Sequence, residues 1–419
     1  MTAEQFDTRY AVAPRFAGDP AARQRAELVV RQQLQHLAKL THRPGNIGWF
    51  EKQVVGPLDQ RQGTPLIGYF CNTIPVEVAY ALGARPVQLG CGNPALVQPG
   101  EEVLSGEICP LAKSSFATFL TADGTPRKCA AVVIPTSCDA KKKLGEIVAD
   151  FRPTFMLNLP PEQNTARYLR LAVAEVERMA TFLADVLGRR LRRRDLLAAI
   201  ELTRHRSVLV RRLQTARAAN PAALSVRDFF IIIQASFAGA DLTEWLHETT
   251  RVISEVEAAG PSHTHQRTPL ILTGAPIFWP NFKPLNLIEE CGADVVADTL
   301  CTGAQSCFDP VVCDEHSWSA LWRALAQRYI FASPCPCFIS QATRLSRILD
   351  LVAEFKAEGV VNYGLRLCPL FDMEVYRLSR ILKERRIPFA NMRTDYSLED
   401  TEQLRVRLEA FLETVGAGT

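Results

Sequence analysis

The stretch VVIPTSCDAKKKL, Val132 to Leu144, joins the pattern of a buried strand to the pattern of a helix. Val132 to Pro135 is apolar, as expected of a strand covered on both faces of a parallel sheet. Cys138 follows, and the run from Asp139 has the acidic start of a helix. The sequence therefore predicts a thiol at the carboxyl end of a strand, the edge where open α/β sheets bind ligands.

The same alternation of strand and helix continues on both sides of this stretch. Short apolar runs predict strands at 66–70, 86–90, 131–135, 154–160, 270–274, 294–300, 360–364 and 387–392. Helical periodicity with almost no strand signal fills 163–258. We therefore expect an α/β protein with two Rossmann-like parallel-sheet domains joined by a helical segment. The expected parts are an N-terminal helical segment (1–60), a first α/β domain (61–162), a helical connector (163–260) and a second α/β domain (261–419).

Composition and charge exclude several classes of protein. The 419 residues carry 48 Lys and Arg against 45 Asp and Glu, so the net charge of +3 does not favour a nucleic-acid binder. The opening MTAEQFDTRYAVAP is mixed and polar, unlike a secretion signal. The most apolar patch, Phe229–Ile233, is far too short to span a membrane. We expect a cytoplasmic protein.

The placement of the 12 cysteines points to a cofactor. Burial as small hydrophobes explains some of them, but five follow predicted strands directly or closely and a sixth, Cys109, opens a helix. A helix N-terminus favours the thiolate form that binds metals. The chain has no C-x-x-C motif, which disfavours zinc ribbons and thioredoxin chemistry. Scattered thiols with few histidines suit an iron–sulfur cluster assembled between two domains. The five after strands are Cys71, Cys91, Cys138, Cys301 and Cys368.

Several motifs in order resemble the 2-hydroxyacyl-CoA dehydratase / benzoyl-CoA reductase superfamily, over about 62–160 and 268–415. They are CNTIPVEVAYALGARPVQL (71–89), ICPLAKSSFATF (108–119), PTSCDAKKKL (135–144), AEGVVNYGLRLC (357–368) and RRIPFANMRTDYS (385–397). The resemblance implies that Cys109, Cys138 and Cys368 hold a [4Fe–4S] cluster between the two domains. Pro369 departs from the acidic residue that the family usually has after the last cysteine.

The surplus cysteines are similar to the pattern of the double-cubane cluster proteins, a branch of that superfamily in which six cysteines hold an [8Fe–9S] cluster. TLCTGAQ (299–305) and SPCPCFI (333–339) favour this branch. Cys91, Cys301 and Cys335 are then the second three ligands. Cys71 competes with Cys91, and Cys337 competes with Cys335.

The resemblance also implies a partner, because the chain lacks the phosphate-binding motif G-x-x-x-x-G-K-[ST]. Family members depend on a separate activator ATPase that carries its own [4Fe–4S] cluster. We expect a homodimeric reductase component that receives low-potential electrons from that ATPase and reduces a small substrate. The alternatives are a subunit of a 2-hydroxyacyl-CoA dehydratase with a single [4Fe–4S] cluster, and a non-catalytic cluster carrier.

Other polar residues have competing interpretations. Glu77 is either a group near the cluster or a charge at a helix N-terminus. His316 is a candidate proton donor, and His263 and His265 are most simply residues of an exposed linker. The basic stretch at 188–195, continued by Arg204, Arg206, Arg211 and Arg212, is expected to be a solvated helix face or a dock for an acidic partner.

Overall fold

The computed structural model describes residues 20–40, 42–56, 63–121, 124–260 and 267–417. His263, His265 and the opening 19 residues of the expected helical segment lie outside this range. The described part of that segment contains helices α1 (Pro20–Ala38) and α2 (Ile47–Val55).

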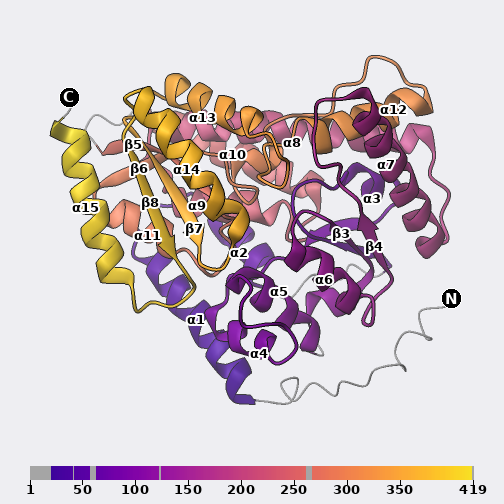
Figure 1. The fold of residues 1–419 in the computed structure, drawn as a ribbon, viewed down its shortest axis with the longest axis horizontal. Coiled ribbons are helices and arrows are strands. Elements are labelled where there is room, and N and C mark those ends of the chain that lie inside the picture. The colour runs from indigo at the N-terminus through magenta and orange to yellow at the C-terminus, as the bar shows by residue number, and fades with distance from the viewer. Residues whose placement is uncertain (1–19, 41, 57–62, 122–123, 261–266, 418–419) are drawn as a thin grey trace.

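Two parallel four-stranded sheets form the centre of the molecule, one in each half of Figure 1. The first sheet has the order β2-β1-β3-β4 and the second the order β6-β5-β7-β8, so the two repeat one topology. All eight strands predicted from the apolar runs are present. They are β1 (Leu66–Tyr69), β2 (Arg85–Gln88), β3 (Cys129–Pro135), β4 (Thr154–Leu157), β5 (Thr268–Gly274), β6 (Ala293–Asp298), β7 (Gly359–Leu365) and β8 (Phe389–Thr394).

The central strands are covered on both faces, which explains their continuous apolar sequences. Every residue of β7 is buried, and β3 is buried except at Ala130. At the end of β5 the backbone of Gly274 has φ +116, and an added Cβ would lie 2.1 Å from the carbonyl oxygen of Tyr363. Only glycine fits this turn away from the sheet.

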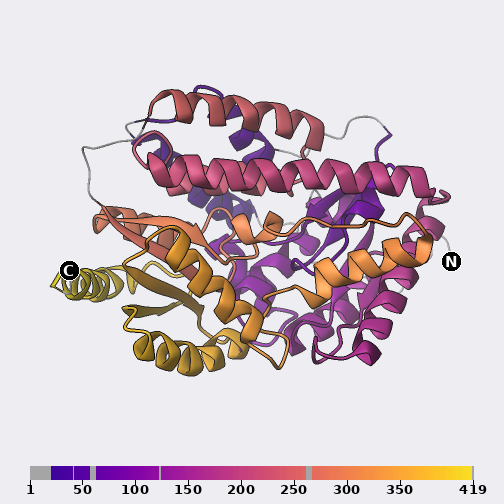
Figure 2. The same cartoon turned by 90° about the horizontal axis from the view of Figure 1, so that it is seen from above.

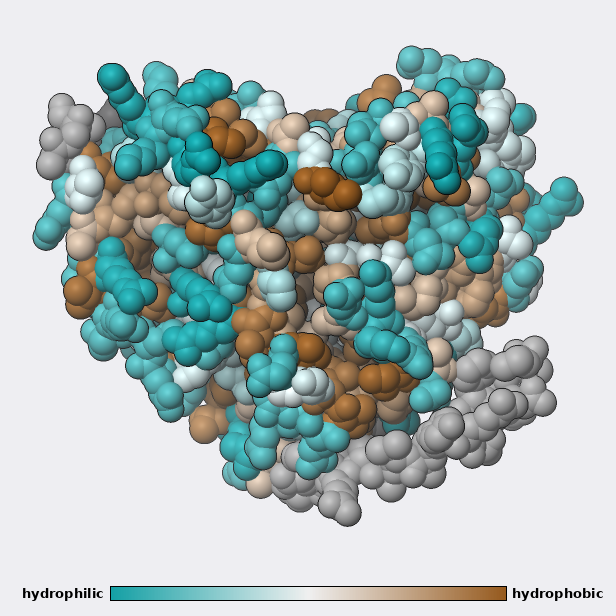
Figure 3. All heavy atoms as spheres, viewed as in Figure 1, coloured by the Kyte–Doolittle hydropathy of each residue, from teal (hydrophilic) through white to brown (hydrophobic). Residues whose placement is uncertain are grey.

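Helices cover the sheets, and a separate helical layer crosses both. Figure 2 shows α8 running along the length of the molecule beside α10. Polar side chains cover most of the face in Figure 3, and apolar ones gather along its middle. The remaining helices are α3 (Glu77–Ala81), α4 (Val97–Glu101), α5 (Pro110–Leu120), α6 (Asp139–Val148), α7 (Ala166–Leu187), α8 (Arg193–Ala219), α9 (Val226–Ala235), α10 (Leu242–Ala258), α11 (Lys283–Glu290), α12 (Trp318–Ala326), α13 (Ala342–Glu354), α14 (Pro369–Glu384) and α15 (Thr401–Ala417).

Helix α8 bonds to both halves of the molecule through buried polar side chains. Its Arg217 donates to Asp294 of β6 at 3.0 Å, and the two side chains are 1% and 4% exposed. Its Thr203 donates to Glu77 of α3 at 2.8 Å. A buried ion pair whose partners are both present is much more stable than either charge buried alone. The helical layer is therefore bonded to the second sheet and to a helix that covers the first.

Only part of the basic stretch on α8 faces solvent, whereas the sequence suggested that all of it would. Arg204 and Arg212 are paired with Glu201 and Glu257 at the surface. Arg206 is buried instead, among tyrosines of both halves. Helical periodicity puts one residue of such a run on the buried face. Of the described helices, none is long and apolar enough to cross a membrane.

Candidate metal centre

Seven thiols come together where the carboxyl edges of the two sheets face each other. Cys109, Cys138 and Cys368 are the N-cap residues of α5, α6 and α14. The carboxyl ends of parallel strands lie on one edge, so thiols placed there meet. The other four follow β1, follow β6, or lie in the segment before α13: Cys71, Cys301, Cys335 and Cys337.

Contacts among the thiols cross between the two halves of the molecule. Cys368 of the second half donates a hydrogen bond to Cys109 of the first. Cys71 of the first half interacts electrostatically with Cys301 and Cys335 of the second. Cys368 of the second half thus lies with Cys109 and Cys138 of the first. Cys71 of the first half lies with Cys301 and Cys335 of the second.

Burial and hydrogen bonding move the thiol pKa values in different directions. The bond from Cys368 lowers the pKa of the Cys109 thiol, and the bond from Cys337 lowers the pKa of Cys335. Burial raises the pKa of Cys71 to about 11 and also raises the pKa of Cys138. Thiols that are easily ionised therefore lie beside thiols that stay protonated unless a metal binds them.

The segments that carry the thiols are held by a strained backbone and by polar neighbours. Cys71 has φ 61 and Leu367, directly before Cys368, has φ 61. Left-handed conformations of this kind are unfavourable for non-glycine residues and concentrate at functional sites. Ser137 lies 3.4 Å from the Cys71 sulfur, and the amide of Gln88 donates to the Cys71 carbonyl at 3.1 Å.

The donor set suits a polynuclear cluster better than a single ion. Within the described ranges, no three His, Cys, Asp or Glu side chains converge closely enough for one metal ion. The seven thiols are instead spread around a wider region between the sheets. Iron–sulfur clusters are held by thiolates that each bind a different iron. The residues present therefore fit such a group.

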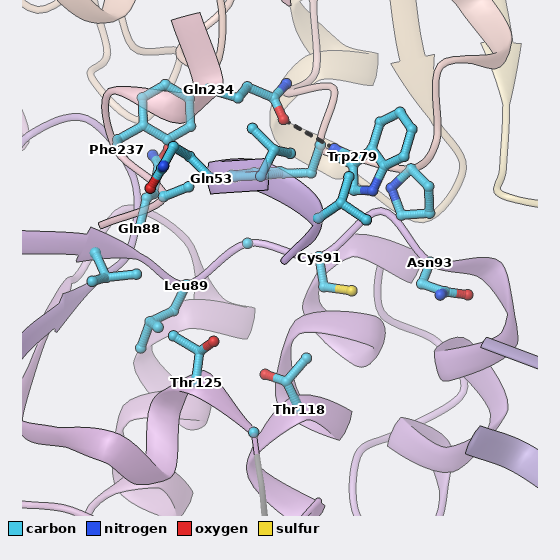
Figure 4. Close-up of a pocket in the computed structure, with 18 of the residues that line it drawn as sticks. Gln53, Gln88, Leu89, Cys91, Asn93, Thr118, Thr125, Gln234, Phe237 and Trp279 are labelled. Carbon is cyan, nitrogen blue, oxygen red and sulfur yellow. Dashed lines mark hydrogen bonds between the residues drawn. The ribbon is translucent and has the colours of Figure 1, made fainter. Parts of the chain in front are cut away.

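Cys91 is placed apart from this group. It lines a pocket of about 370 Å³ with Gln88, Thr118 and Trp279, and none of the seven thiols lines it. Figure 4 shows Cys91 below Gln234, which accepts a hydrogen bond from the Trp279 backbone at 3.1 Å. The Cys91 backbone bonds to Ser114 and Ser115 of α5, and none of the seven thiols is among the groups that shift its pKa. Of the two competitors, Cys71 is the one that joins the group.

Glu77 and His316 lie in two other environments. Glu77 is 1% exposed and accepts bonds from Thr203 and from the Tyr329 hydroxyl at 3.0 Å. It therefore links the first half, helix α8 and the second half. His316 is exposed in the segment before α12. Cys129, the first residue of β3, donates to the Thr125 carbonyl at 3.5 Å.

Comparison with known proteins places this arrangement in a family. The model of the family described as 2-hydroxyglutaryl-CoA dehydratase, D-component, matches residues 71–415.

The chain belongs to this D-component family.

Similar proteins carry dehydratase names. YjiM of Escherichia coli (strain K12), named as a proposed dehydratase subunit, is 29% identical over 84% of this chain and 92% of its own length. The beta subunit of (R)-2-hydroxyglutaryl-CoA dehydratase from Acidaminococcus fermentans is 21% identical over 84% of this chain and 93% of its own. The (R)-phenyllactyl-CoA dehydratase beta subunit of Clostridium sporogenes is 18% identical over 85% and 93%.

Two charged residues beside the thiols were not predicted from the sequence as parts of the site. Lys141 is 9% exposed, and its ammonium lies 4.0 Å from the centre of the Phe70 ring. Arg344 is 5% exposed and lies near Cys301 and Cys335. Lys141 is the first of three consecutive lysines. Helical periodicity puts it, and not the next two, on the buried face of α6, so its burial could have been predicted from the sequence.

Proposed function

We propose that this chain is an iron–sulfur reductase component that reduces a small substrate at a double-cubane [8Fe–9S] cluster. The observation that supports the proposal is the convergence of seven thiols from both sheets. A single cubane uses at most four cysteines. Seven thiols at one sheet edge are therefore more than one cubane requires.

The cysteines would divide into two sets. Cys109, Cys138 and Cys368 would hold one cubane, and Cys71, Cys301 and Cys335 the other, with Cys337 as the alternative to Cys335. Cys71 replaces Cys91 in this assignment, because Cys91 lies in a separate pocket. When bound, the cluster supplies electron transfer at low potential.

The chain's own residues prepare this site for the cluster. The N-terminus of α6 directs the Lys141 backbone N–H to the Cys138 sulfur at 3.4 Å, which favours the thiolate. Gln88 and Ser137 orient the Cys71 segment. Burial between the sheets limits the access of water, which protects a reduced site from side reactions.

The electrons would come from a partner. The sequence has no phosphate-binding loop of the P-loop type, so the ATP-driven step is assigned to an activator ATPase with its own [4Fe–4S] cluster. We further propose that the chain acts as a homodimer in the cytoplasm.

A second candidate is a subunit of a 2-hydroxyacyl-CoA dehydratase with a single [4Fe–4S] cluster. The names of the relatives from Acidaminococcus fermentans and Clostridium sporogenes favour it. The reaction removes water from a 2-hydroxyacyl-CoA to give an enoyl-CoA, with no net change in oxidation state. Cys109, Cys138 and Cys368 would hold its cluster.

Iron and sulfide counting on anaerobically purified protein separates these candidates. About eight irons per chain are expected for the double cubane, whereas about four support the dehydratase. The loaded chain alone should hydrolyse no ATP, and turnover should require an activator ATPase with Mg-ATP or a very strong artificial reductant. A loaded chain that turns over neither type of substrate with any reductant is a cluster carrier.

A further inference from the structure

Two buried cations border the thiol group, one on each sheet's side. Lys141, in the first turn of α6, is 9% exposed, and its ammonium contacts the face of Phe70. Arg344, in the first turn of α13, is 5% exposed and donates to the Thr273 hydroxyl at 2.8 Å. Both positions place a fixed positive charge close to thiols.

The two cations differ in their counter-ions. The Arg344 guanidinium lies 3.0 Å from the Glu374 carboxylate, and both side chains are less than a tenth exposed. No carboxylate among the described residues forms an ion pair with Lys141. The next two lysines do have partners at the surface: Lys142 lies 3.4 Å from Asp139 and Lys143 lies 2.9 Å from Glu146.

A buried ammonium without an anion is unfavourable, because the interior solvates it poorly. The anions that can face Lys141 are thiolates. The backbone N–H of Lys141 donates to the Cys138 sulfur at 3.4 Å, and its side chain interacts electrostatically with all three thiols of the first half in the group: Cys71, Cys109 and Cys138. At Cys335 the effect of Arg344 is opposed by Glu374. Lys141 therefore faces the thiols with no carboxylate paired to it, whereas Arg344 acts with the Glu374 carboxylate beside it.

We infer that Lys141 is a positioning cation that compensates negative charge on the first-sheet side of the cluster site, whereas on the second-sheet side the charge of Arg344 is partly offset by Glu374. This inference rests on the proposed function. One electron, taken from the reduced cluster of the activator, adds one negative charge to the site. Lys141 would stabilise that charge and so raise the reduction potential of the site.

The test is potentiometry of the loaded, full-length protein under anaerobic conditions, followed by EPR. Lys141→Met removes the charge and keeps the length of the side chain, so the midpoint potential should shift to a more negative value at unchanged iron content. Lys141→Arg should restore the potential toward that of the wild type. Lys142→Met is the matched control, because Lys142 is exposed and paired, and it should leave the potential unchanged.

Glu374→Gln supplies a second test, which does not depend on whether the Lys141→Met protein still binds iron and sulfide. It leaves Arg344 without a counter-ion, so a potential assigned to the second-sheet side should become less negative. A loaded Lys141→Met protein with the wild-type potential overturns the inference, and so does a loaded Glu374→Gln protein with no shift. Wild-type protein that binds no iron and sulfide overturns the proposed function instead.

Discussion

The two sheets share one strand order but present their thiols differently. In the first half, Cys109 and Cys138 are N-caps of helices, and of the group only Cys71 lies in a connecting segment. In the second half, Cys301, Cys335 and Cys337 lie in connecting segments, and only Cys368 is an N-cap. The same edge thus offers a rigid set of thiols on one side and an adaptable set on the other. Ligands built on helices and strands are more strictly positioned than ligands on loops.

Serine substitutions of the thiols should separate the two sets. A hydroxyl replaces a soft thiolate poorly. Cys109→Ser, Cys138→Ser and Cys368→Ser should each remove most of the bound iron and the activity. Cys301→Ser and Cys335→Ser should lower the iron content or change the EPR signal without unfolding the chain. Iron and sulfide analysis with circular dichroism measures both effects.

Matched controls are available among the other cysteines. Cys129→Ser and Cys313→Ser should keep full iron, because Cys129 begins a strand and Cys313 donates to the Glu315 carbonyl in a surface segment. Cys91→Ser should also keep it, whereas Cys71→Ser should not. Full iron and an unchanged spectrum in both Cys301→Ser and Cys335→Ser would make those residues ordinary buried thiols.

The contacts of α8 with the two halves should differ in energy. Asp294→Asn leaves the Arg217 guanidinium buried without a counter-ion and should lower the free energy of unfolding by about 3–5 kcal/mol. Thr203→Val removes one hydrogen bond to Glu77, which keeps its bond from Tyr329. This substitution should lower the free energy of unfolding by about 2 kcal/mol. Urea denaturation of the iron-free proteins compares them. Equal losses would show that the two halves are fixed equally.

A pH effect should be specific to the second half, because β6 ends in Asp298 and its counterpart β2 ends in Gln88. Burial raises the pKa of Asp298 to about 6, although the backbone N–H groups of Leu300 and Ala304 bind the carboxylate. The folded state therefore holds this proton more tightly than the unfolded state does. The stability from Asp298 is complete below about pH 4 and is lost as the pH rises through about 6.

The loss amounts to about 3 kcal/mol. Urea denaturation of the iron-free protein at several pH values between 4 and 7 should show it as a slope that Asp298→Asn flattens. Asp314→Asn, a change of an exposed carboxylate, should leave the slope as it is. A wild-type slope in the Asp298→Asn protein would contradict the assignment.

Sequence reasoning predicted the strands well and the detailed site less well. Buried parallel strands have continuous apolar sequences, so β3 and β7 were recognisable without any knowledge of contacts. Cys71 and Cys91 both follow strands, and only their contacts in the folded chain separate them, with thiols at Cys71 and a separate pocket at Cys91. Glu77 could not be assigned because its partners Thr203 and Tyr329 are distant in the sequence. Lys141 differs from Lys142 only in helix phase and in the ring that it covers.

The hydrogen bond between Cys109 and Cys368 has a consequence for biosynthesis. Chains emerge from the ribosome N-terminus first, and domains tend to fold in that order. The first sheet and its thiols are therefore complete long before Cys368 is synthesised near the C-terminal end. A cluster that needs both residues can be inserted only after the second sheet has folded. Until then the exposed thiols of the nascent protein are open to oxidation, so oxygen should limit the yield of loaded protein during synthesis as well as during purification.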